Sequence, residues 1–394
     1  MNILVLNSGS SSVKVQLISM PEKKMLATGL VERIGLPGSR VKFEANGIKR
    51  VDERAIENHE SGLKLVAELL LDPELGLLNS ADEIEAVGHR VVHGGSLFSE
   101  TVEIDENVKQ QIKDLFGLAP LHNPHNLKGI EVAETIFTKA RQIAVFDTAF
   151  HQSIPEEAYR YAIHDRFLDD HQIRLYGFHG TSHKYVSERA IASMDSKSTR
   201  IVTVHLGNGC SATAVKDGKS LDHSLGFGPM NGLIMGTRSG DIDQSVIFFL
   251  MNELNYTNEQ VQNLLQQESG MLGLTGYSDL REIESKAEQG DKKCQLALRM
   301  NAYRVKKFIG AYAAAMNGLD ALVFTAGIGE NSDVMRRLIC QDMDYLGISL
   351  NEEKNAVRGD EMREVHQDGS KVRIMIIPTN EELEIAIQSY QLIT

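Results

Sequence analysis

The sequence predicts an α/β protein built from two related domains. Two observations support this: a strand–turn–strand plan occurs twice, at Ile3–Val15 and at Ile201–Val215, and predicted strands alternate with predicted helices. Alternating strands and helices are typical of the α/β class, because each helix covers a face of the sheet. At roughly 150 residues per domain, 394 residues suffice for two domains of ordinary size.

Each copy of the repeat has a short β-branched strand, a Gly/Ser/Asn turn and a second β-rich run. A reverse-turn signal follows each copy, at Met20–Lys23 and at Lys216–Lys219. We therefore expect two β-hairpins around polar loops. The alternative is that two strand–turn–strand segments are alike by chance.

A second pair of segments, Ile143–Ala149 and Ala321–Gly327, has the apolar pattern of buried strands that run into small or polar residues. We interpret this pair as a further part of the duplication, with the strand ends facing the same cleft as the hairpin loops. The second domain is expected to begin near residue 149. The predicted division is residues 1–148 plus 383–394 for the first domain and 149–382 for the second.

Helices are predicted between the strands. Apolar residues within Leu63–Leu71 and within Ala302–Met316 recur at helical spacing. A capping-box pattern at Thr379–Glu382 predicts the start of the last helix, directly after a strand at Ile374–Ile377. Because this helix follows a strand of the second domain, we expect it to return to the first.

Composition limits the partners. The formal charge is 41 − 54 = −13, which disfavours nucleic acid and acidic membrane surfaces as partners. The three cysteines, Cys210, Cys294 and Cys340, are too scattered for a disulfide framework or a cysteine zinc site. No secretory signal is visible at the N-terminus, and the longest apolar run, Val246–Met251, is too short to cross a bilayer. We expect a soluble cytoplasmic protein.

The polar loops of the two hairpins are candidate phosphate sites, because glycine lets backbone N–H groups approach an anion. In the first loop Asn7 and Ser8–Ser12 supply amide and hydroxyl groups, and Lys14 is placed to reach a phosphate. The second loop, Gly207–Ala212, satisfies G-x-G-x-x-A, but a dinucleotide site requires a following helix, and here a turn follows instead. No P-loop signature is present.

Two arginines lie in loops and suit an anionic substrate. Arg90 follows a strand-like segment, and Arg238 lies between glycines in Met235–Asp241. A guanidinium matches the oxygens of a carboxylate or phosphate and stays charged, so two of them suit a site where negative charge moves between anions. For either arginine alone, a structural salt bridge is an equally good interpretation.

Histidines concentrate in the middle of the chain. His122, His125, His179 and His183 invite a zinc interpretation, but no H-E-x-x-H motif is present. The Gly and Thr after His179 disfavour a helix that would stack ligands four residues apart. We favour histidines as hydrogen-bond donors to a charged transition state.

Two carboxylates are candidate functional groups. Asp147 ends a buried strand, where a carboxylate is costly unless it is hydrogen-bonded or functional. Glu381 lies in the first turn of the last helix, where it either stabilises the helix dipole or coordinates a metal.

Nine motifs follow one another along the chain: Asn7–Ser12, His89–Gly95, Ala119–Pro124, Phe146–Gln152, Gly177–His183, His205–Gly209, Met235–Asp241, Phe324–Asn331 and Pro378–Glu382. Taken together, these motifs resemble those of the acetokinase family, the acetate kinases. The resemblance runs through the whole chain, which makes it far more specific than any one motif.

The resemblance implies the superfold of sugar kinases, heat-shock ATPases and actin: two duplicated ribonuclease H-like (actin-like ATPase) domains with a nucleotide cleft between them. It also implies a homodimer formed through the second domain, with Mg²⁺ or Mn²⁺ as cofactor and ATP/ADP as substrate. The implied reaction is reversible in-line transfer of the γ-phosphoryl group to acetate, which gives acetyl phosphate and ADP.

The same resemblance implies roles for individual residues. The catalytic residues are Asp147, His179 and Arg238; the substrate-binding residues are Arg90, Val92, Leu121, His122, Phe178 and Pro229; the metal ligands are Asn7 and Glu381. The ATP-binding residues are Lys14, His205, Leu206, Gly207, Asn208, Gly209, Asp279, Leu280, Arg281, Gly327, Ile328, Gly329, Glu330 and Asn331. Because acetate is already ionised at neutral pH, we expect Asp147 to orient Mg²⁺, water or an arginine and not to remove a proton.

The sequence departs from the family pattern near Arg238. Gly228–Gly232 stands where the family usually has Thr-Pro-Leu-Glu-Gly, and Gln244 replaces the usual Pro. This change leaves the choice between acetate and propionate open. The alternatives are therefore a kinase for propionate or another short-chain acid and, more distantly, a non-kinase ATPase of the superfold.

Overall fold

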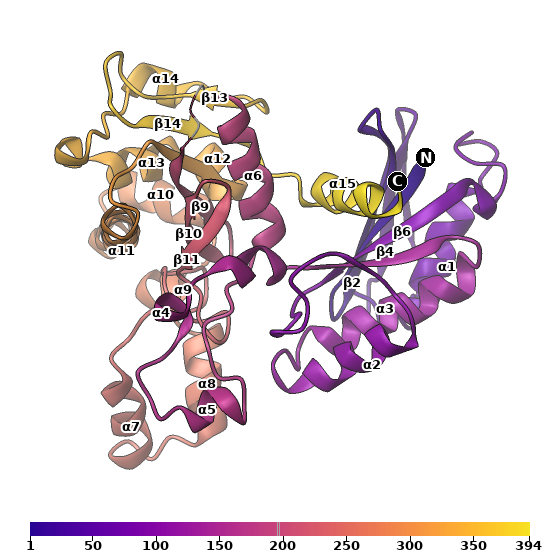
Figure 1. The fold of residues 1–394 in the computed structure, drawn as a ribbon, viewed down its shortest axis with the longest axis horizontal. Helices are drawn as coiled ribbons and strands as arrows, with labels where there is room; N and C mark the ends of the chain where they lie inside the picture. The colour runs from indigo at the N-terminus through magenta and orange to yellow at the C-terminus, as the bar shows by residue number, and fades with distance from the viewer. Residues whose placement is uncertain (195, 197) are drawn as a thin grey trace. The chain divides into compact units, whose positions relative to one another are not determined.

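The computed structural model describes residues 1–194, 196 and 198–394, and the chain divides into two compact units. The first unit comprises Met1–Phe150 and Asn380–Thr394, and the second comprises His151–Thr379. Each unit contains one β-sheet with helices packed on it (Figure 1), so the predicted α/β class is confirmed.

The first unit is built on an eight-stranded sheet with the order β5-β4-β3-β2-β1-β6-β8-β7. The strands β1, β6 and β8 are parallel, whereas β2 to β5 form an antiparallel meander beside them. The strands are β1 (Asn2–Ser8), β2 (Ser12–Ser19), β3 (Lys24–Glu32), β4 (Arg40–Ala45), β5 (Ile48–Glu53), β6 (Ile84–Val91), β7 (Val102–Glu103) and β8 (Arg141–Phe146). The helices are α1 (His59–Leu70), α2 (Glu106–Asp114), α3 (Asn123–Ile136) and α15 (Glu381–Ile393), with short 3₁₀ turns at Ala81–Glu83 and Leu115–Gly117.

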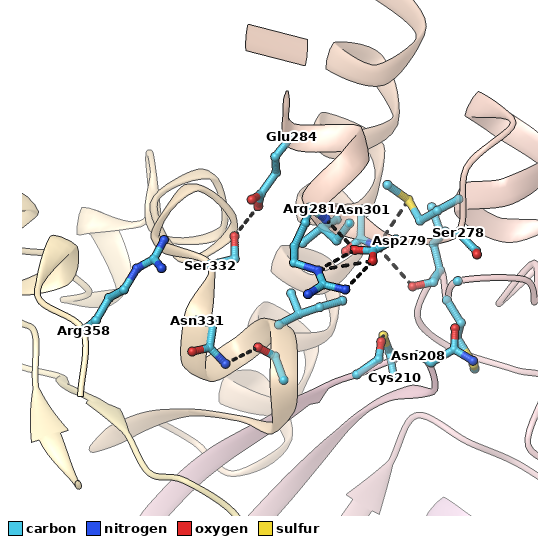
Figure 2. A pocket seen from close by; sticks show the side chains of 18 residues that line it. Asn208, Cys210, Ser278, Asp279, Arg281, Glu284, Asn301, Asn331, Ser332 and Arg358 are labelled. Atoms are coloured by element: carbon cyan, nitrogen blue, oxygen red, sulfur yellow. Dashed lines mark hydrogen bonds and ion pairs between the residues drawn. The ribbon is translucent and has the colours of Figure 1, made fainter. Parts of the chain in front are cut away.

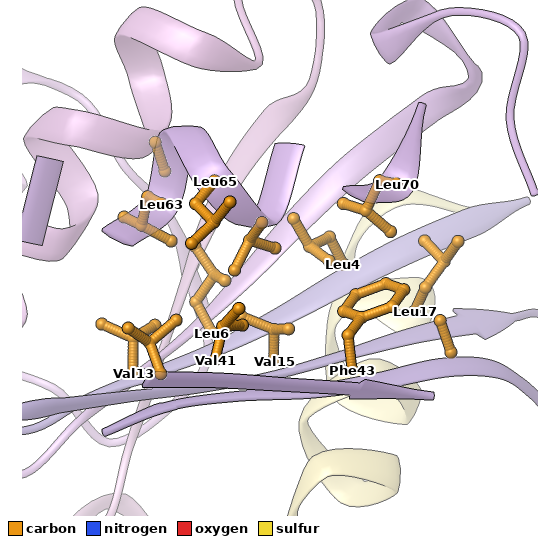
Figure 3. Close-up of a cluster of buried hydrophobic side chains, with 14 of the residues drawn as sticks. Leu4, Leu6, Val13, Val15, Leu17, Val41, Phe43, Leu63, Leu65 and Leu70 are labelled. Carbon is orange, nitrogen blue, oxygen red and sulfur yellow. The ribbon is translucent and has the colours of Figure 1, made fainter. Parts of the chain in front are cut away.

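Both faces of this sheet are covered, and the side chains of β1 contribute apolar residues alternately to the two faces. Successive side chains of a strand point to opposite faces. Leu4 and Leu6 join the cluster beneath α1 that Figure 3 shows, whereas Ile3 and Val5 pack with residues of α15 on the other face. The near-continuous apolar run at the N-terminus is therefore a strand buried on both sides.

The last helix belongs to the first unit. Its residues pack on β1, β6 and β8, and the approach to β6 is close: a Cβ added at Gly88 would lie 2.7 Å from Ser389 Oγ. The observed units differ from the sequence-based division, which assigned residues 149–150 and 380–382 to the second domain. The N-cap also differs from the prediction, because Asn380, not Thr379, accepts the hydrogen bond from the Leu383 amide.

The second unit is built on a six-stranded sheet with the order β11-β10-β9-β12-β14-β13. Its strands are β9 (Arg200–Leu206), β10 (Cys210–Lys216), β11 (Lys219–His223), β12 (Ala321–Thr325), β13 (Arg363–Glu364) and β14 (Arg373–Ile376). The α-helices are α4 (Glu156–Tyr159), α5 (Arg166–Asp169), α6 (Gly180–Ala192), α7 (Gln244–Asn252), α8 (Asn258–Gln267), α9 (Gly270–Thr275), α10 (Leu280–Glu288), α11 (Lys292–Ala315), α12 (Ala326–Asn331), α13 (Asp333–Cys340) and α14 (Glu352–Ala356). Short 3₁₀ turns lie at Ala149–Ser153, which spans the boundary between the units, and at Asp344–Leu346.

The two sheets share a topology. In each, a three-stranded antiparallel meander is followed by two parallel strands: β3-β2-β1-β6-β8 in the first unit and β11-β10-β9-β12-β14 in the second. The predicted pairing of the strand at Ile143–Ala149 with the strand at Ala321–Gly327 is wrong in detail. β12 lies next to β9 as β6 lies next to β1, so β12 corresponds to β6, and β8 corresponds to β14. Apolar content alone could not distinguish neighbouring buried strands.

The second hairpin forms as predicted. β9 and β10 pair across the loop around Gly207–Gly209, and β10 turns into β11 with positive φ at Asp217 and Gly218. A strand, and not a helix, follows the G-x-G-x-x-A segment, which removes the dinucleotide interpretation. None of the described helices is both long enough and apolar enough to span a membrane.

Candidate active-site residues in the two units

In the first unit, three predicted site residues lie at one edge of the sheet. The register pairs Leu6 with His89 and Arg90 with Val145 across parallel strands. The carboxyl ends of β1, β6 and β8 therefore coincide, and ligands of α/β sheets bind at such edges. Asn7, Arg90 and Asp147 are brought together although they are far apart in the sequence.

Arg90 and Asp147 form a close ion pair. The Arg90 Nε and Nη2 atoms donate to Asp147 Oδ2 at 2.9 and 2.5 Å, and Arg90 Nη1 lies 3.5 Å from Asn7 Oδ1. Asp147 is only 1% exposed, whereas the Arg90 side chain is 20% exposed. Burial alone would lower the pKa of Arg90, but the charges of Asp147, Glu381 and Glu382 hold that pKa above its usual value. Arg90 therefore stays positively charged, and part of its side chain remains exposed to solvent.

The N-terminus of α15 adds two carboxylates to this cluster. Burial, with further contributions from Asp147 and Glu382, raises the pKa of Glu381, although Arg90 and Lys14 oppose the shift. Lys14 Nζ lies 2.6 Å from Glu382 Oε1, and the lysine side chain is 45% exposed. The structure therefore gives Lys14 an acidic partner that sequence reasoning missed, because Glu382 lies at the far end of the chain.

The charge of this cluster suits a cation. Three carboxylates, on Asp147, Glu381 and Glu382, face two cationic groups, on Lys14 and Arg90, so the cluster is anionic if all are ionised. Asn7 and Glu381 supply amide and carboxylate oxygens, the ligand types that Mg²⁺ prefers, and Mg²⁺ usually takes only one or two protein ligands beside water and phosphate oxygens. These donors fit Mg²⁺. In the described residues no group of three or more His, Cys, Asp or Glu side chains is arranged to hold a metal.

The loops around this edge are held by buried amides that sequence reasoning missed. The Asn126 side chain donates to Ser8 O at 2.8 Å and accepts from Val92 N at 3.1 Å, which joins the loop after β1 to the loop after β6. Leu121, two residues before the start of α3, is 61% exposed. Asn126 lies two residues beyond the predicted motif Ala119–Pro124, and nothing in the sequence showed which backbone groups its amide would bind.

In the second unit, eight of the predicted ATP-binding residues line one cavity of about 820 Å³ (Figure 2). They are Gly207, Asn208, Asp279, Leu280, Arg281, Gly327, Ile328 and Asn331. The remaining predicted residues of this unit, which do not line the cavity, are His205, Leu206, Gly209, Gly329 and Glu330. Lining residues that sequence reasoning missed are Cys210, Ile234, Met235, Gly236, Met271, Ser278, Glu284, Asn301, Ser332 and Arg358.

Strand order explains why distant loops meet at this cavity. β9 and β12 are parallel neighbours, so the hairpin loop after β9 and helix α12 after β12 lie at the same edge of the sheet. The helix begins at Ala326 with φ +63°, a left-handed conformation that a residue with a side chain rarely adopts. Asn331 Nδ2 donates to Gly327 O at 2.8 Å, which Figure 2 shows.

Two arginines hold the carbonyls at the end of α12. Arg336, only 1% exposed, donates to Gly329 O at 2.8 Å and to Asn355 through two further bonds, and Arg363 donates to Glu330 O at 3.0 Å. Burial, together with the nearby Arg363, lowers the pKa of Arg336 to about 10. Cationic groups are favourable at a helix C-terminus, so both arginines support the segment that lines the cavity.

Histidines form a cluster in the second unit. His179 is the N-cap of α6 with φ +55°, and its ring stacks on that of His205 with the centroids 4.4 Å apart. The expectation that no helix follows His179 is wrong: α6 begins at Gly180, because its small and apolar residues are buried against β9 and β12. Both ring nitrogens of His183 are hydrogen-bonded to hydroxyl groups, of Thr203 and Ser211.

Arg238 differs from Arg90 in its surroundings. Its Nη1 donates to Pro229 O at 2.9 Å, and in the described part of the chain no carboxylate is hydrogen-bonded to it. Burial lowers the pKa of Arg238 from its ordinary value. The guanidinium therefore carries a charge that the unit itself leaves largely uncompensated, in the same loop as the predicted substrate residue Pro229. Phe178, beside His179, is 4% exposed.

Comparison with known sequences gives matches along the whole chain. The profile of the Acetokinase family matches residues 2–387. The acetate kinase of Flavobacterium johnsoniae is 59% identical over 393 residues, which cover 100% of both chains. That of Carboxydothermus hydrogenoformans is 49% identical over 396 residues, covering 100% of this chain and 99% of the relative.

Solved structures agree with the sequence matches. The crystal structure of Porphyromonas gingivalis acetate kinase matches with a TM-score of 0.95 at 46% identity, covering 100% of both chains. A propionate kinase from Francisella tularensis matches with a TM-score of 0.92 at 42% identity, covering 98% of both chains. The resemblance inferred from the motifs is confirmed, and the chain belongs to the acetokinase family.

Proposed function

We propose that this protein is a phosphotransferase with a carboxyl group as acceptor, and that it transfers the γ-phosphoryl group of ATP reversibly to acetate, giving acetyl phosphate and ADP. The observation that carries the proposal is the full-length identity of 59% to a protein named acetate kinase. The anion-binding groups described above support it, since each unit offers cationic or amide groups suited to phosphate or carboxylate.

The acetate carboxylate is the nucleophile in this proposal. One of its oxygens attacks the γ-phosphorus in line with the bond to ADP, and no proton needs to be removed. Arg90 binds the acetate or the phosphoryl group through the open part of its fork, and Asp147 orients Arg90 through their ion pair. His179 and Arg238 stabilise the negative charge that develops on the transferring group.

Asn7 and Glu381 are the proposed ligands for Mg²⁺ or Mn²⁺. When bound, the ion supplies positive charge that offsets the phosphate oxygens. Asn7 contributes an amide oxygen, and Glu381 contributes a carboxylate whose pKa is raised by burial, so that a bound cation would stabilise its ionised form. Lys14, paired with Glu382, keeps part of its side chain exposed for the nucleotide phosphates.

The cavity of the second unit is the proposed nucleotide site. Its volume of about 820 Å³ lies within the range of small-molecule sites. The backbone N–H group of Gly327, which lines the cavity in the first turn of α12, is the candidate for contacting a phosphate oxygen.

The segment Gly228–Gly232, which carries the predicted pocket residue Pro229, departs from the family pattern. We propose that Val92, Leu121, Phe178 and Pro229 contact the methyl group. The propionate kinase of Francisella tularensis, at 42% identity, shows that a longer acid is used by a protein of this fold. Values of kcat/KM for acetate, propionate and butyrate test the preference, and a maximum at propionate would replace acetate as the substrate.

A hydroxamate assay tests the reaction itself. The purified protein is incubated with acetate, MgATP and hydroxylamine, and acetohydroxamate is measured together with ADP. The proposal requires both products in equal amounts. ADP without hydroxamate from any short-chain acid would support a non-kinase ATPase instead.

We further propose a homodimer formed through the second unit. Helix α7 buries none of its residues, and Phe248 and Phe249 on it are 64% and 56% exposed. Leu296, Met300 and Tyr303 form an exposed stripe on α11 at helical spacing. Light scattering after gel filtration should give twice the chain mass of 43.6 kDa, and a Phe248→Glu variant should shift the equilibrium toward the monomer.

A further inference from the structure

A chain of hydrogen bonds leads from the core of the second unit to His179. Thr203 Oγ1 lies 2.7 Å from His183 Nδ1, His183 Nε2 lies 2.7 Å from Ser211 Oγ, and Ser211 Oγ lies 2.9 Å from His179 Nδ1. Thr203, His183 and Ser211 are each 0% exposed. The chain crosses β9, α6 and β10, so it exists only in the folded unit.

A neutral histidine has one donor and one acceptor nitrogen, and a hydroxyl has a single proton. An arrangement in which Ser211 accepts from both histidines would leave its own buried proton without an acceptor. With that arrangement excluded, the chain can run in only two directions. In one, Thr203 donates to His183, His183 donates to Ser211, and Ser211 donates to His179 Nδ1. In the other, every bond is reversed, and His179 Nδ1 donates to Ser211.

The hydroxyl proton of Thr203 decides between these directions. Within the described residues, the Thr203 hydroxyl has His183 as its only hydrogen-bond partner. In the reversed direction this hydroxyl would accept from His183, and its own buried proton would have no acceptor. Leaving a buried donor unpaired is costly, whereas the forward direction satisfies every donor in the chain.

We propose that Thr203 and His183, acting through Ser211, are positioning residues that hold His179 in the tautomer whose Nε2 carries the proton. His179 then donates a hydrogen bond through Nε2 as a neutral imidazole and needs no second proton. This inference rests on the role of His179 in phosphoryl transfer proposed above. It adds an explanation of how the hydrogen-bond chain places the ring proton of His179 on Nε2, the nitrogen that donates during transfer.

The surroundings of His183 keep it neutral. Burial, with the neighbouring His151, His205 and His179, lowers the pKa of His183 well below 6.5. The titratable groups that face it are these three histidines and His223 on β11, whose ring lies edge-on with centroids 5.2 Å apart. A protonated His183 would donate from both nitrogens and could not accept from Thr203, so neutrality is a condition of the forward direction.

The test combines tautomer measurement with kinetics on the full-length protein. Long-range ¹H–¹⁵N spectra of histidine-labelled protein report which ring nitrogen carries the proton, and a His179→Gln variant assigns the His179 signals. Thr203→Val removes the donor with little change of shape, and Thr203→Ser keeps the hydroxyl. Thr213→Val is the matched control, because Thr213 Oγ1 lies 2.7 Å from His223 Nδ1 in the same cluster but outside the chain to His179.

We expect protons on Nε2 and not on Nδ1 for both His179 and His183 in the unaltered protein. In Thr203→Val the His179 signals should show a mixture of tautomers, and kcat should fall by about two- to tenfold with unchanged KM for acetate, as expected for loss of one orienting hydrogen bond. Thr203→Ser should restore the single tautomer and the kcat, and Thr213→Val should leave both unchanged.

The outcomes separate the two proposals. A proton on Nδ1 of His183 or of His179 in the unaltered protein would overturn the direction of the chain. A single His179 tautomer in a folded Thr203→Val variant would overturn the part played by Thr203. A tautomer mixture with unchanged kcat would leave the chain intact and contradict the proposed role of His179 in transfer.

Discussion

The two arginines proposed to meet the substrates lie in opposite electrostatic surroundings. Arg90 in the first unit is paired with Asp147 at 2.5 Å and has Glu381 and Glu382 nearby. Arg238 in the second unit donates to the carbonyl of Pro229 and, among the described residues, has no carboxylate hydrogen-bonded to it. The acidic surroundings hold the pKa of Arg90 above its usual value, and burial lowers that of Arg238.

This difference separates two functions of a guanidinium. A paired arginine is held in place and has most of its charge compensated, so it suits orientation of a substrate beside a metal ion. An uncompensated, partly buried arginine interacts strongly with negative charge that develops during the reaction. We therefore propose that the first unit's cluster mainly binds and orients the substrate and that Arg238 mainly stabilises the transition state.

Removal of the uncompensated charge should have the largest effect. Arg238→Ala is expected to lower kcat by a factor on the order of 10² to 10⁴. Steady-state kinetics with acetate and MgATP check this. Arg304→Ala is the control, because Arg304 also donates to loop carbonyls, of Gly232 and Asp241, and should show a much smaller loss. Unchanged kcat with a raised KM would make Arg238 a binding residue only.

Weakening the paired arginine should have a smaller effect. Asp147→Asn keeps an oxygen for Arg90 but removes the charge, so the guanidinium is less firmly oriented. We expect kcat/KM for acetate to fall by a factor on the order of 10². Near-normal turnover of Asp147→Asn with MgATP would show that this ion pair does not orient the reaction.

Loss of the hydrogen bond from Arg336 to α12 should have the next largest effect. Arg336→Met fills a similar volume but leaves Gly329 O without its donor, and KM for ATP should rise by about tenfold with little change in KM for acetate. Arg200→Met is the control, because Arg200 pairs with Asp320 at the other end of β9. If the two variants lose equal stability but only Arg336→Met changes KM for ATP, then Arg336 acts by positioning α12 and not through general stability.

The smallest effect is expected from pH acting on Glu381. Its pKa is raised by burial, so the proton must leave before the carboxylate can bind Mg²⁺. The half-saturating Mg²⁺ concentration should rise as pH falls through this pKa, by up to about tenfold per pH unit, and Glu381→Gln should remove that dependence.

The metal-free protein should show the opposite trend in stability. Near the raised pKa the native state binds more protons than the unfolded chain, so the free energy of unfolding falls as pH rises through it. Denaturant titrations with EDTA measure this trend. An increase of metal-free stability over the same pH range, equal in the unaltered protein and in Glu381→Gln, would assign the pH dependence to another group.

Much of the fold follows from local patterns. β-Branched runs, polar turns and helical spacing predicted both hairpins, the helix at α1 and the α/β class. The wrong details share one cause. The pairing of Ile143–Ala149 with Ala321–Gly327, the N-cap of α15 and the absence of a helix after His179 each depended on local sequence where tertiary packing decided the outcome.

The sequence by itself determined the types of chemical group at the site, because glycine-rich loops, loop arginines and carboxylates at strand ends can be recognised from local sequence. Only the tertiary structure decided which of these groups are partners. Lys14 meets Glu382 because α15 returns to the first sheet, and Arg336 meets Gly329 because α13 packs beside α12. Such pairings depend on strand order and helix docking between distant segments, which local pattern does not encode.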